Sequence, residues 1–190
     1  MQFVFLLLGM MMNKMKSLTK AEFGTRCDKD AVFVWVYCKK TRPYKDYMDG
    51  TCDFTIPTIL AQFRWDGKFG AIGGGVDEGE SLEEALEREV CEELGCAIAG
   101  TPVELVSHVM EFEDGFKFGV HSYCQEVSEI DMYHLQHVAP LNAKDFKPEV
   151  SGYCVLHCAD KLLPELFKNN FAATAKIELK MLLEKINESQ

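Results

Sequence analysis

A dense run of carboxylates lies between residues 80 and 93, in a segment with the pattern of one helix. Its last turns carry Glu89, Glu92 and Glu93, where the helix dipole disfavours negative charge by about 0.3 to 1 kcal/mol each. At about 100° per residue, these side chains share the face that Leu82 and Leu86 make apolar. Two carboxylates about 4 Å apart repel by about 4 kcal/mol at an effective dielectric near 20. The pattern therefore indicates a cation among them.

The oxygen ligands that these carboxylates supply indicate which cations can bind. Carboxylate oxygens in this number suit hard divalent ions, so we expect Mg²⁺ or Mn²⁺. The sequence has no His/Cys cluster near these residues that would favour zinc. An ion held in this way binds phosphate oxygens and lowers the pKa of an attacking water. The segment therefore predicts a metal site for hydrolysis of a phosphate bond.

The helix that carries these carboxylates has clear signals at both ends. Ser81 followed three residues later by Glu84 has the pattern of a capping box. Gly95 stands where a glycine ends a helix in the left-handed conformation. These signals predict a helix between Ser81 and Gly95.

The rest of the chain alternates strands, tight turns and helices. Asp-Gly pairs in 65–68 and 113–115 predict hairpin turns. We expect strands over 31–38, 55–64, 69–72, 103–112, 116–127 and 150–157, and helices over 128–137 and about 171–187. The order indicates an α+β or α/β/α architecture.

Composition bounds the class of protein. The 190 residues suit one domain over residues 21–190, after an N-terminal extension over 1–20 whose apolar run is too short to span a bilayer. A net charge of −10 argues against a broad basic face that holds duplex DNA. Eight cysteines without a CxxC pair predict a reduced, intracellular protein. We expect it in the cytoplasm, with the nucleus left open, and without stable membrane association.

The acidic segment resembles a known motif. Gly74 is followed by five residues, Glu80, seven residues and then Arg88-Glu89-Val90-Cys91-Glu92-Glu93-Leu94-Gly95-Cys96. This resembles the Nudix box, GX5EX7REUXEEXGU, at every fixed position, with Cys96 at the final apolar position. The resemblance implies an α/β/α sandwich with a mixed sheet, dependence on a divalent metal, and hydrolysis of a nucleoside diphosphate linked to another group.

Carried onto this chain, the resemblance implies a metal-ligand set. Glu89, Glu92 and Glu93 are then ligands of Mg²⁺ or Mn²⁺, one of them assisting as a base. The carbonyl of Gly73 is a further ligand. Glu149, in a loop before a strand, stands where many Nudix enzymes place another catalytic carboxylate.

The resemblance also implies roles for residues around the ligands. Arg88 and Glu80 are expected to form a structural ion pair. The glycines of 73–75 allow close approach of the backbone to metal and phosphates.

Outside the box, residues 25–185 are most similar to the Nudix branch that decaps small nucleolar RNA and hydrolyses inosine diphosphate. The segments 59–70, 106–109, 143–152 and 169–179 carry this similarity. By position, Arg64 and His108 correspond to substrate-contacting residues of that branch. From the residues alone, Arg64 also fits a surface strand position and His108 a buried sheet histidine.

Three departures from that branch leave the base preference open. Asp30 stands for a histidine that contacts the base, Ala71 for a stacking phenylalanine, and Glu178 for a glutamine on the last helix. Glu178 also fits a solvated helix position. An ionised Asp30 can accept a hydrogen bond from the exocyclic amine of guanine or adenine, so we expect amino-purines to be hydrolysed at least as well as inosine diphosphate.

The expected substrate is a capped RNA 5′ end or a free nucleotide. The basic and aromatic stretch 39–47 suits single-stranded RNA, although solvated loop charge is the better explanation of it. The family resemblance also implies a homodimer. The alternatives are a nucleotide-pool (deoxy)inosine diphosphatase and, from a different class, a non-catalytic nucleotide-binding regulator with a Nudix fold.

Overall fold

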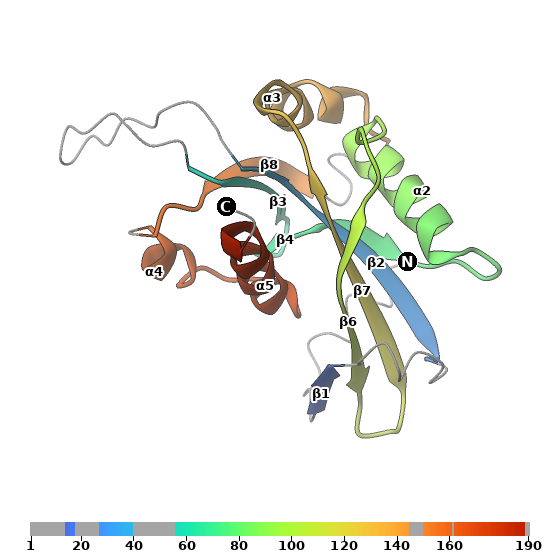
Figure 1. The fold of residues 1–190 in the computed structure, drawn as a ribbon. Coiled ribbons are helices and arrows are strands. Elements are labelled where there is room, and N and C mark those ends of the chain that lie inside the picture. The colour runs from blue at the N-terminus through green and yellow to red at the C-terminus, as the bar shows by residue number, and fades with distance from the viewer. Residues whose placement is uncertain (1–13, 18–26, 40–55, 145–149, 161, 189–190) are drawn as a thin grey trace.

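The computed structural model describes residues 14–17, 27–39, 56–144, 150–160 and 162–188. A mixed β-sheet lies between α2 and α3 on one face and α5 on the other (Figure 1). This confirms the α/β/α sandwich that the box predicts.

The sheet is built around one long central strand. Its described strands are β1 (Lys14–Ser17), β2 (Lys29–Cys38), β3 (Thr58–Arg64), β4 (Phe69–Gly70), β5 (Ile72–Gly75), β6 (Val103–Glu111), β7 (Lys117–Glu126) and β8 (Val150–His157). The order is β1-β6-β7-β2-β3-β4, with β5 paired to β2 and β8 to β3. The β2–β7 pair is parallel and the other pairs are antiparallel, so the sheet is mixed.

Helix α2 (Leu82–Leu94) begins and ends where the sequence predicts. The Ser81 side chain accepts from the Glu84 N–H, and the Glu84 side chain accepts from the Ser81 N–H, which completes the capping box. Gly95 ends the helix in the left-handed conformation, with φ 72°.

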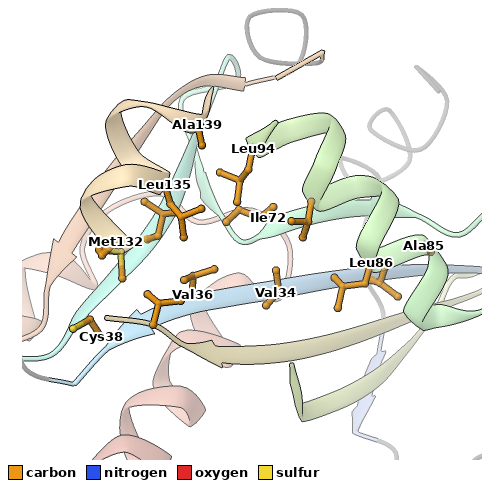
Figure 2. Close-up of a cluster of buried hydrophobic side chains, with 14 residues drawn as sticks. Val34, Val36, Cys38, Ile72, Ala85, Leu86, Leu94, Met132, Leu135 and Ala139 are labelled. Carbon is orange, nitrogen blue, oxygen red and sulfur yellow. The ribbon is translucent and has the colours of Figure 1, made fainter. Parts of the chain in front are cut away.

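Two apolar clusters hold the layers together. In the first, alternate residues of β2 pack against α2 and α3 (Figure 2). In the second, the intervening residues Trp35 and Tyr37 pack against α5 (Ala175–Glu188). Because successive side chains of a strand point to opposite faces, β2 supplies both cores. Its odd and even positions therefore belong to different sides of the molecule.

The remaining helices differ in part from the prediction. Helix α3 (Glu129–His137) is as expected, whereas η2 (Ala139–Asn142) and α4 (Leu163–Leu166) were not predicted. Helix α5 begins at Ala175 rather than near 171. The reason is that the segment just before it pairs with β4: the Phe69 N–H donates to Asn170 O, and the Ala172 N–H donates to Phe69 O.

Several predictions fall partly or wholly outside the described residues. Glu149, Cys52 and residues 40–47 of the basic stretch lie there, and of the predicted N-terminal extension only 14–17 are described, as β1 paired with β6. The described cysteines are free thiols. None of the described helices has the length and apolar character needed to cross a membrane.

Candidate active site

The glycines at the end of β5 are packed directly against carboxylates of α2. The Gly73 N–H donates to Oε2 of Glu93 at 2.8 Å. A Cβ on Gly73 would lie 2.1 Å from the carbonyl oxygen of Val32, and one on Gly74 would lie 2.6 Å from a carboxylate oxygen of Glu89. Both positions therefore require glycine. Glu89 and Glu93 are both buried.

Arg88 forms hydrogen bonds with several residues of the box. Its Nε and one terminal nitrogen donate to the two carboxylate oxygens of Glu80, each at 2.9 Å, which confirms the predicted ion pair. The same guanidinium donates to Glu89 at 2.7 Å and to the carbonyl of Gly75 at 2.8 Å. The hydrogen bonds to Glu80 and the charge of Glu89 raise the pKa of Arg88 further, so it stays a cation. Arg88 thus positions the loop and one predicted ligand together.

Glu92 is held from a different direction. Its Oε1 accepts from Lys144 Nζ at 2.8 Å, and its Oε2 lies 3.5 Å from Arg88. The hydrogen bond and charge of Lys144, with the charge of Arg88, hold the pKa of Glu92 below its usual range despite partial burial. This carboxylate is therefore ionised at neutral pH.

The residues of this face fit a hard divalent ion in their chemistry. The predicted donors, Glu89, Glu92 and Glu93, are all carboxylates, and Gly74 leaves room for one of them against the backbone. Within the described residues the three do not converge on one point, since each is oriented by a different group. The predicted role of the Gly73 carbonyl stays a prediction.

On the opposite face of the sheet, Glu178 is a buried carboxylate with partners inside the protein. Its Oε2 accepts from the indole Nε1 of Trp35 at 3.1 Å, and its Oε1 accepts from the hydroxyl of Thr174. Glu178 is thus not a solvated helix charge. Ala71 is buried in the same apolar cluster as Trp35.

His108 lies on this same face and has an unusual environment. It is 2% exposed, and neither ring nitrogen has a hydrogen-bond partner among the described residues. Burial lowers the pKa of His108, while the charge of Glu178 acts in the opposite direction. The Ser122 hydroxyl on β7 is also buried without a partner in the described part of the chain. His108 on β6 and Glu178 on α5 therefore interact electrostatically, and Ser122 lies on the neighbouring strand β7.

Asp30 lies elsewhere, on the α2 face of β2. Its Oδ1 lies 3.0 Å from Nε2 of His121, and Nδ1 of His121 lies 3.0 Å from the Ser107 hydroxyl. A Cβ on Gly119 would lie 2.0 Å from the same Asp30 oxygen, so glycine is needed there. The structure thus brings Asp30 to His121 and Ser107, and not to His108.

Arg64 lies at the hairpin between β3 and β4. Its Nε and one terminal nitrogen donate to the two oxygens of Asp66 at 3.2 and 3.3 Å. These contacts, with the charge of Lys68, lower the pKa of Asp66 against the opposing effect of burial. Of the predicted substrate residues, Ala71, His108 and Glu178 lie on the α5 face of the sheet and Asp30 lies on the α2 face. Arg64 lies at the hairpin, with its Cδ 3.5 Å from where a Cβ on Gly70 would lie.

Sequence reasoning missed the residues that orient the predicted ones. They are Trp35, Asp66, His121, Lys144 and Thr174. Only Asp66 carried a local signal, since it lies two residues from its partner in the Asp-Gly turn. Trp35, His121 and Lys144 are distant in sequence from the residues that they contact. Thr174 lies just before α5, a helix that the sequence predicts to begin earlier.

Comparison with known proteins agrees with this geometry. A family model described as Nudt16-like, U8 snoRNA-decapping enzyme-like, matches residues 30–188. The chain belongs to the Nudt16-like family. This confirms the resemblance to the decapping branch, and the match includes α2 with its carboxylates and the face around α5.

Curated relatives of this Nudt16-like chain carry two different names. It is 35% identical over 131 residues to the U8 snoRNA-decapping enzyme of Xenopus laevis, covering 64% of this chain and 60% of that protein. The mouse enzyme is 33% identical, covering 64% and 65%. The Tudor-interacting repair regulator protein of Gallus gallus is 30% identical, covering 68% of this chain and 42% of the relative. The chain thus spans less than two thirds of the length of these relatives.

Solved structures agree on the fold. A mutT/nudix family protein from Listeria innocua matches with a TM-score of 0.54 and 17% identity, covering 86% of this chain and 97% of that one. The Ap4A hydrolase of C. elegans in a binary complex matches with a TM-score of 0.55 and 14% identity, covering 84% and 98%. At this identity the likeness supports the Nudix fold of the Nudt16-like chain, and not its substrate.

Proposed function

We propose that this protein is a divalent-metal-dependent hydrolase that cleaves the pyrophosphate bond of a nucleoside diphosphate linked to another group. Capped RNA 5′ ends are the first expected substrate, and purine nucleoside diphosphates the second. The observation that carries the proposal is the pair of buried carboxylates, Glu89 and Glu93, packed against the glycines of β5. Burial of acidic groups is costly unless charge partners surround them, which favours a functional reason for their placement.

The metal would be held by Glu89, Glu92 and Glu93, with the Gly73 carbonyl as a further proposed ligand. When bound, Mg²⁺ or Mn²⁺ neutralises phosphate charge and lowers the pKa of an attacking water. The protein's own contribution is orientation: Arg88 holds Glu89, and the Gly73 N–H holds Glu93. We also propose Glu149 as an additional catalytic carboxylate.

The preference for capped RNA is supported by the family and by the relatives named as U8 snoRNA-decapping enzymes. The expected preference for amino-purines depends on Asp30, which would share its carboxylate between the amine and His121. A charge-assisted hydrogen bond is worth about 1.5 to 3 kcal/mol, or roughly ten- to a hundredfold in kcat/KM. Because Asp30 and His108 lie on opposite faces of the sheet, substitutions at the two positions test two separate modes of base recognition.

The test is a side-by-side measurement of kcat/KM for inosine diphosphate, guanosine diphosphate and a capped oligonucleotide, with Mg²⁺, Mn²⁺ or EDTA. We expect metal-dependent hydrolysis, with the guanosine substrates equal to or better than inosine diphosphate. Asp30→His should lower that ratio. A wild-type preference for inosine diphosphate above about tenfold would instead support the alternative function, a sanitising (deoxy)inosine diphosphatase.

A second candidate function is a non-catalytic nucleotide-binding regulator. It is favoured by the likeness to proteins named Tudor-interacting repair regulator. The complete set of box carboxylates argues against it. Phosphate release by the purified chain with and without Mg²⁺ separates the two, since a regulator would bind nucleotide without releasing phosphate.

We also propose a homodimer, and a location in the cytoplasm or the nucleus, on the family resemblance. Light scattering of the purified protein tests the first, and imaging of the tagged full chain tests the second. A monomer at micromolar concentration would remove the homodimer from the proposal without affecting the metal site.

A further inference from the structure

Two large aromatic side chains are exposed where β3 ends. Phe63 is 40% exposed and Trp65 is 66% exposed. Trp65 lies at the tip of a hairpin whose geometry is fixed by bonds between Arg64 and both Gly67 and Lys68, with Gly67 at φ 76°. The turn that carries Trp65 thus has a defined backbone geometry.

Phe63 is the outer member of a longer aromatic series. Ring centroids are 5.4 Å apart for Phe63 and Phe69, 6.0 Å for Phe69 and Phe171, and 6.3 Å for Phe171 and Phe167. The backbone bonds of Phe69 to residues 170 and 172 join the hairpin to the segment before α5. Figure 1 shows α4 and α5 on the same side of the sheet. We name residues 63–69 and 165–180 the aromatic surface.

The aromatic surface is basic in an acidic protein. The chain as a whole has a net charge of −10. The two segments of the surface contain five cationic residues against two accessible carboxylates, because the third, Glu178, is buried and bonded to Trp35 and Thr174. The cations are Arg64, Lys68, Lys168, Lys176 and Lys180, and the accessible carboxylates are Asp66 and Glu165. Lys180 lies 5.3 Å above the ring of Phe167.

We infer that the aromatic surface binds single-stranded RNA, with Trp65 stacking on a base. Exposed rings next to cations are what an unpaired polynucleotide needs, since bases stack on the rings and phosphates contact the cations. Phe69 belongs to β4 at the edge of the sheet and lies four positions before Gly73 in the sequence.

This inference deepens the proposed function, because it assigns a place to the RNA chain that follows the 5′ end. It differs from the sequence-based expectation, which placed RNA contact at 39–47. It stands on binding alone, so it can be tested with RNA that carries no cap and without metal. A failure of hydrolysis and a failure of RNA binding are then separate results.

Tryptophan fluorescence gives a direct readout. The chain has two tryptophans, and Trp35 is 0% exposed, so quenching by RNA reports on Trp65. We expect an uncapped single-stranded oligoribonucleotide in EDTA to quench the emission to saturation. Trp65→Ala should weaken binding of a labelled oligonucleotide, measured by anisotropy, by about tenfold. Tyr133→Ala on α3, which removes a ring that is 60% exposed, is the matched control and should bind as wild type.

One further variant and two further ligands, guanosine diphosphate and duplex RNA, test the interpretation. Lys68→Ala should reduce the salt dependence of the binding constant by about one phosphate contact. Trp65→Ala should hydrolyse guanosine diphosphate at the wild-type rate. The inference is overturned if RNA leaves the emission unchanged, if Trp65→Ala binds RNA like wild type, or if duplex RNA of the same sequence binds as tightly. It is also overturned if Trp65→Ala slows hydrolysis of guanosine diphosphate, since Trp65 then belongs to the nucleotide site.

Discussion

The box and the region around His108 differ in how their buried polar groups are partnered. On the α2 face, carboxylates have partners within the chain, such as the Gly73 N–H for Glu93 and Arg88 for Glu89. On the α5 face, both ring nitrogens of His108 and the hydroxyl of Ser122 lack partners among the described residues. The partners of the box carboxylates orient these charges before any ligand binds. At His108 and Ser122, each buried group left unpaired lowers the free energy of unfolding by about 1 to 3 kcal/mol. Substitutions on the α2 face should therefore affect chemistry, and substitutions at His108 should affect stability.

The largest effect is expected from Glu93→Gln. The substitution removes charge with almost no change in volume, so we expect turnover to fall by at least about a hundredfold while the fold is retained. Steady-state kinetics at saturating Mg²⁺, with circular dichroism as a check on folding, measure this.

The matched control for that variant is Glu87→Gln, because Glu87 is exposed on the same helix. It should keep wild-type turnover. Retention of more than about a tenth of the activity by Glu93→Gln would show that this face is not the metal site.

A smaller effect on catalysis is expected from Gly74→Ala. The new methyl group would lie within 2.7 Å of the carboxylate of Glu89, which Arg88 already holds. We expect a fall of roughly tenfold in turnover and a higher Mg²⁺ requirement, because overpacking displaces the side chain. Gly75→Ala is the control, since a Cβ there meets no atom within 4 Å. Equal activity of the two variants would contradict the role of Gly74.

The smallest effect is expected from His108→Leu, and it is on stability. Burial lowers the pKa of His108 and Glu178 opposes this, so the folded form stays neutral below the usual pKa near 6.5. As pH falls through that value, the unfolded chain binds a proton that the folded chain does not, and stability decreases by at most about 1.4 kcal/mol per pH unit. Urea unfolding between pH 7.5 and 5 should show this slope in wild type and a shallower one in His108→Leu.

His108→Leu should also differ from wild type in stability at neutral pH. Leucine has no unpaired nitrogens, so His108→Leu should raise the free energy of unfolding by about 1 to 2 kcal/mol. Identical pH slopes for wild type and variant, or a loss of stability at pH 7.5, would indicate that His108 has a stabilising partner outside the described residues.

Separation along the chain explains what the sequence predicted well. Helix α2, its two caps and the Arg88–Glu80 pair depend on residues at most eight positions apart, so spacing was sufficient. The partners of Glu178 and Asp30 were missed because they depend on contacts across the sheet. Trp35 is 143 residues from Glu178, and His121 is 91 residues from Asp30. Strand alternation predicts that Asp30 and Trp35 face opposite sides, but a single sequence does not identify what each one meets there.

The central claim is that the acidic face of α2 binds a divalent ion in the folded protein. Thermal melting of wild type and of the Glu89→Gln/Glu93→Gln double variant, with and without millimolar Mg²⁺ or Mn²⁺, tests it most directly. A ligand that binds only the folded state at a hundred times its Kd adds about 2.7 kcal/mol, so the wild-type melting temperature should rise by several degrees and that of the double variant should not. No rise at a metal concentration that supports hydrolysis, or an equal rise in the double variant, would contradict the account.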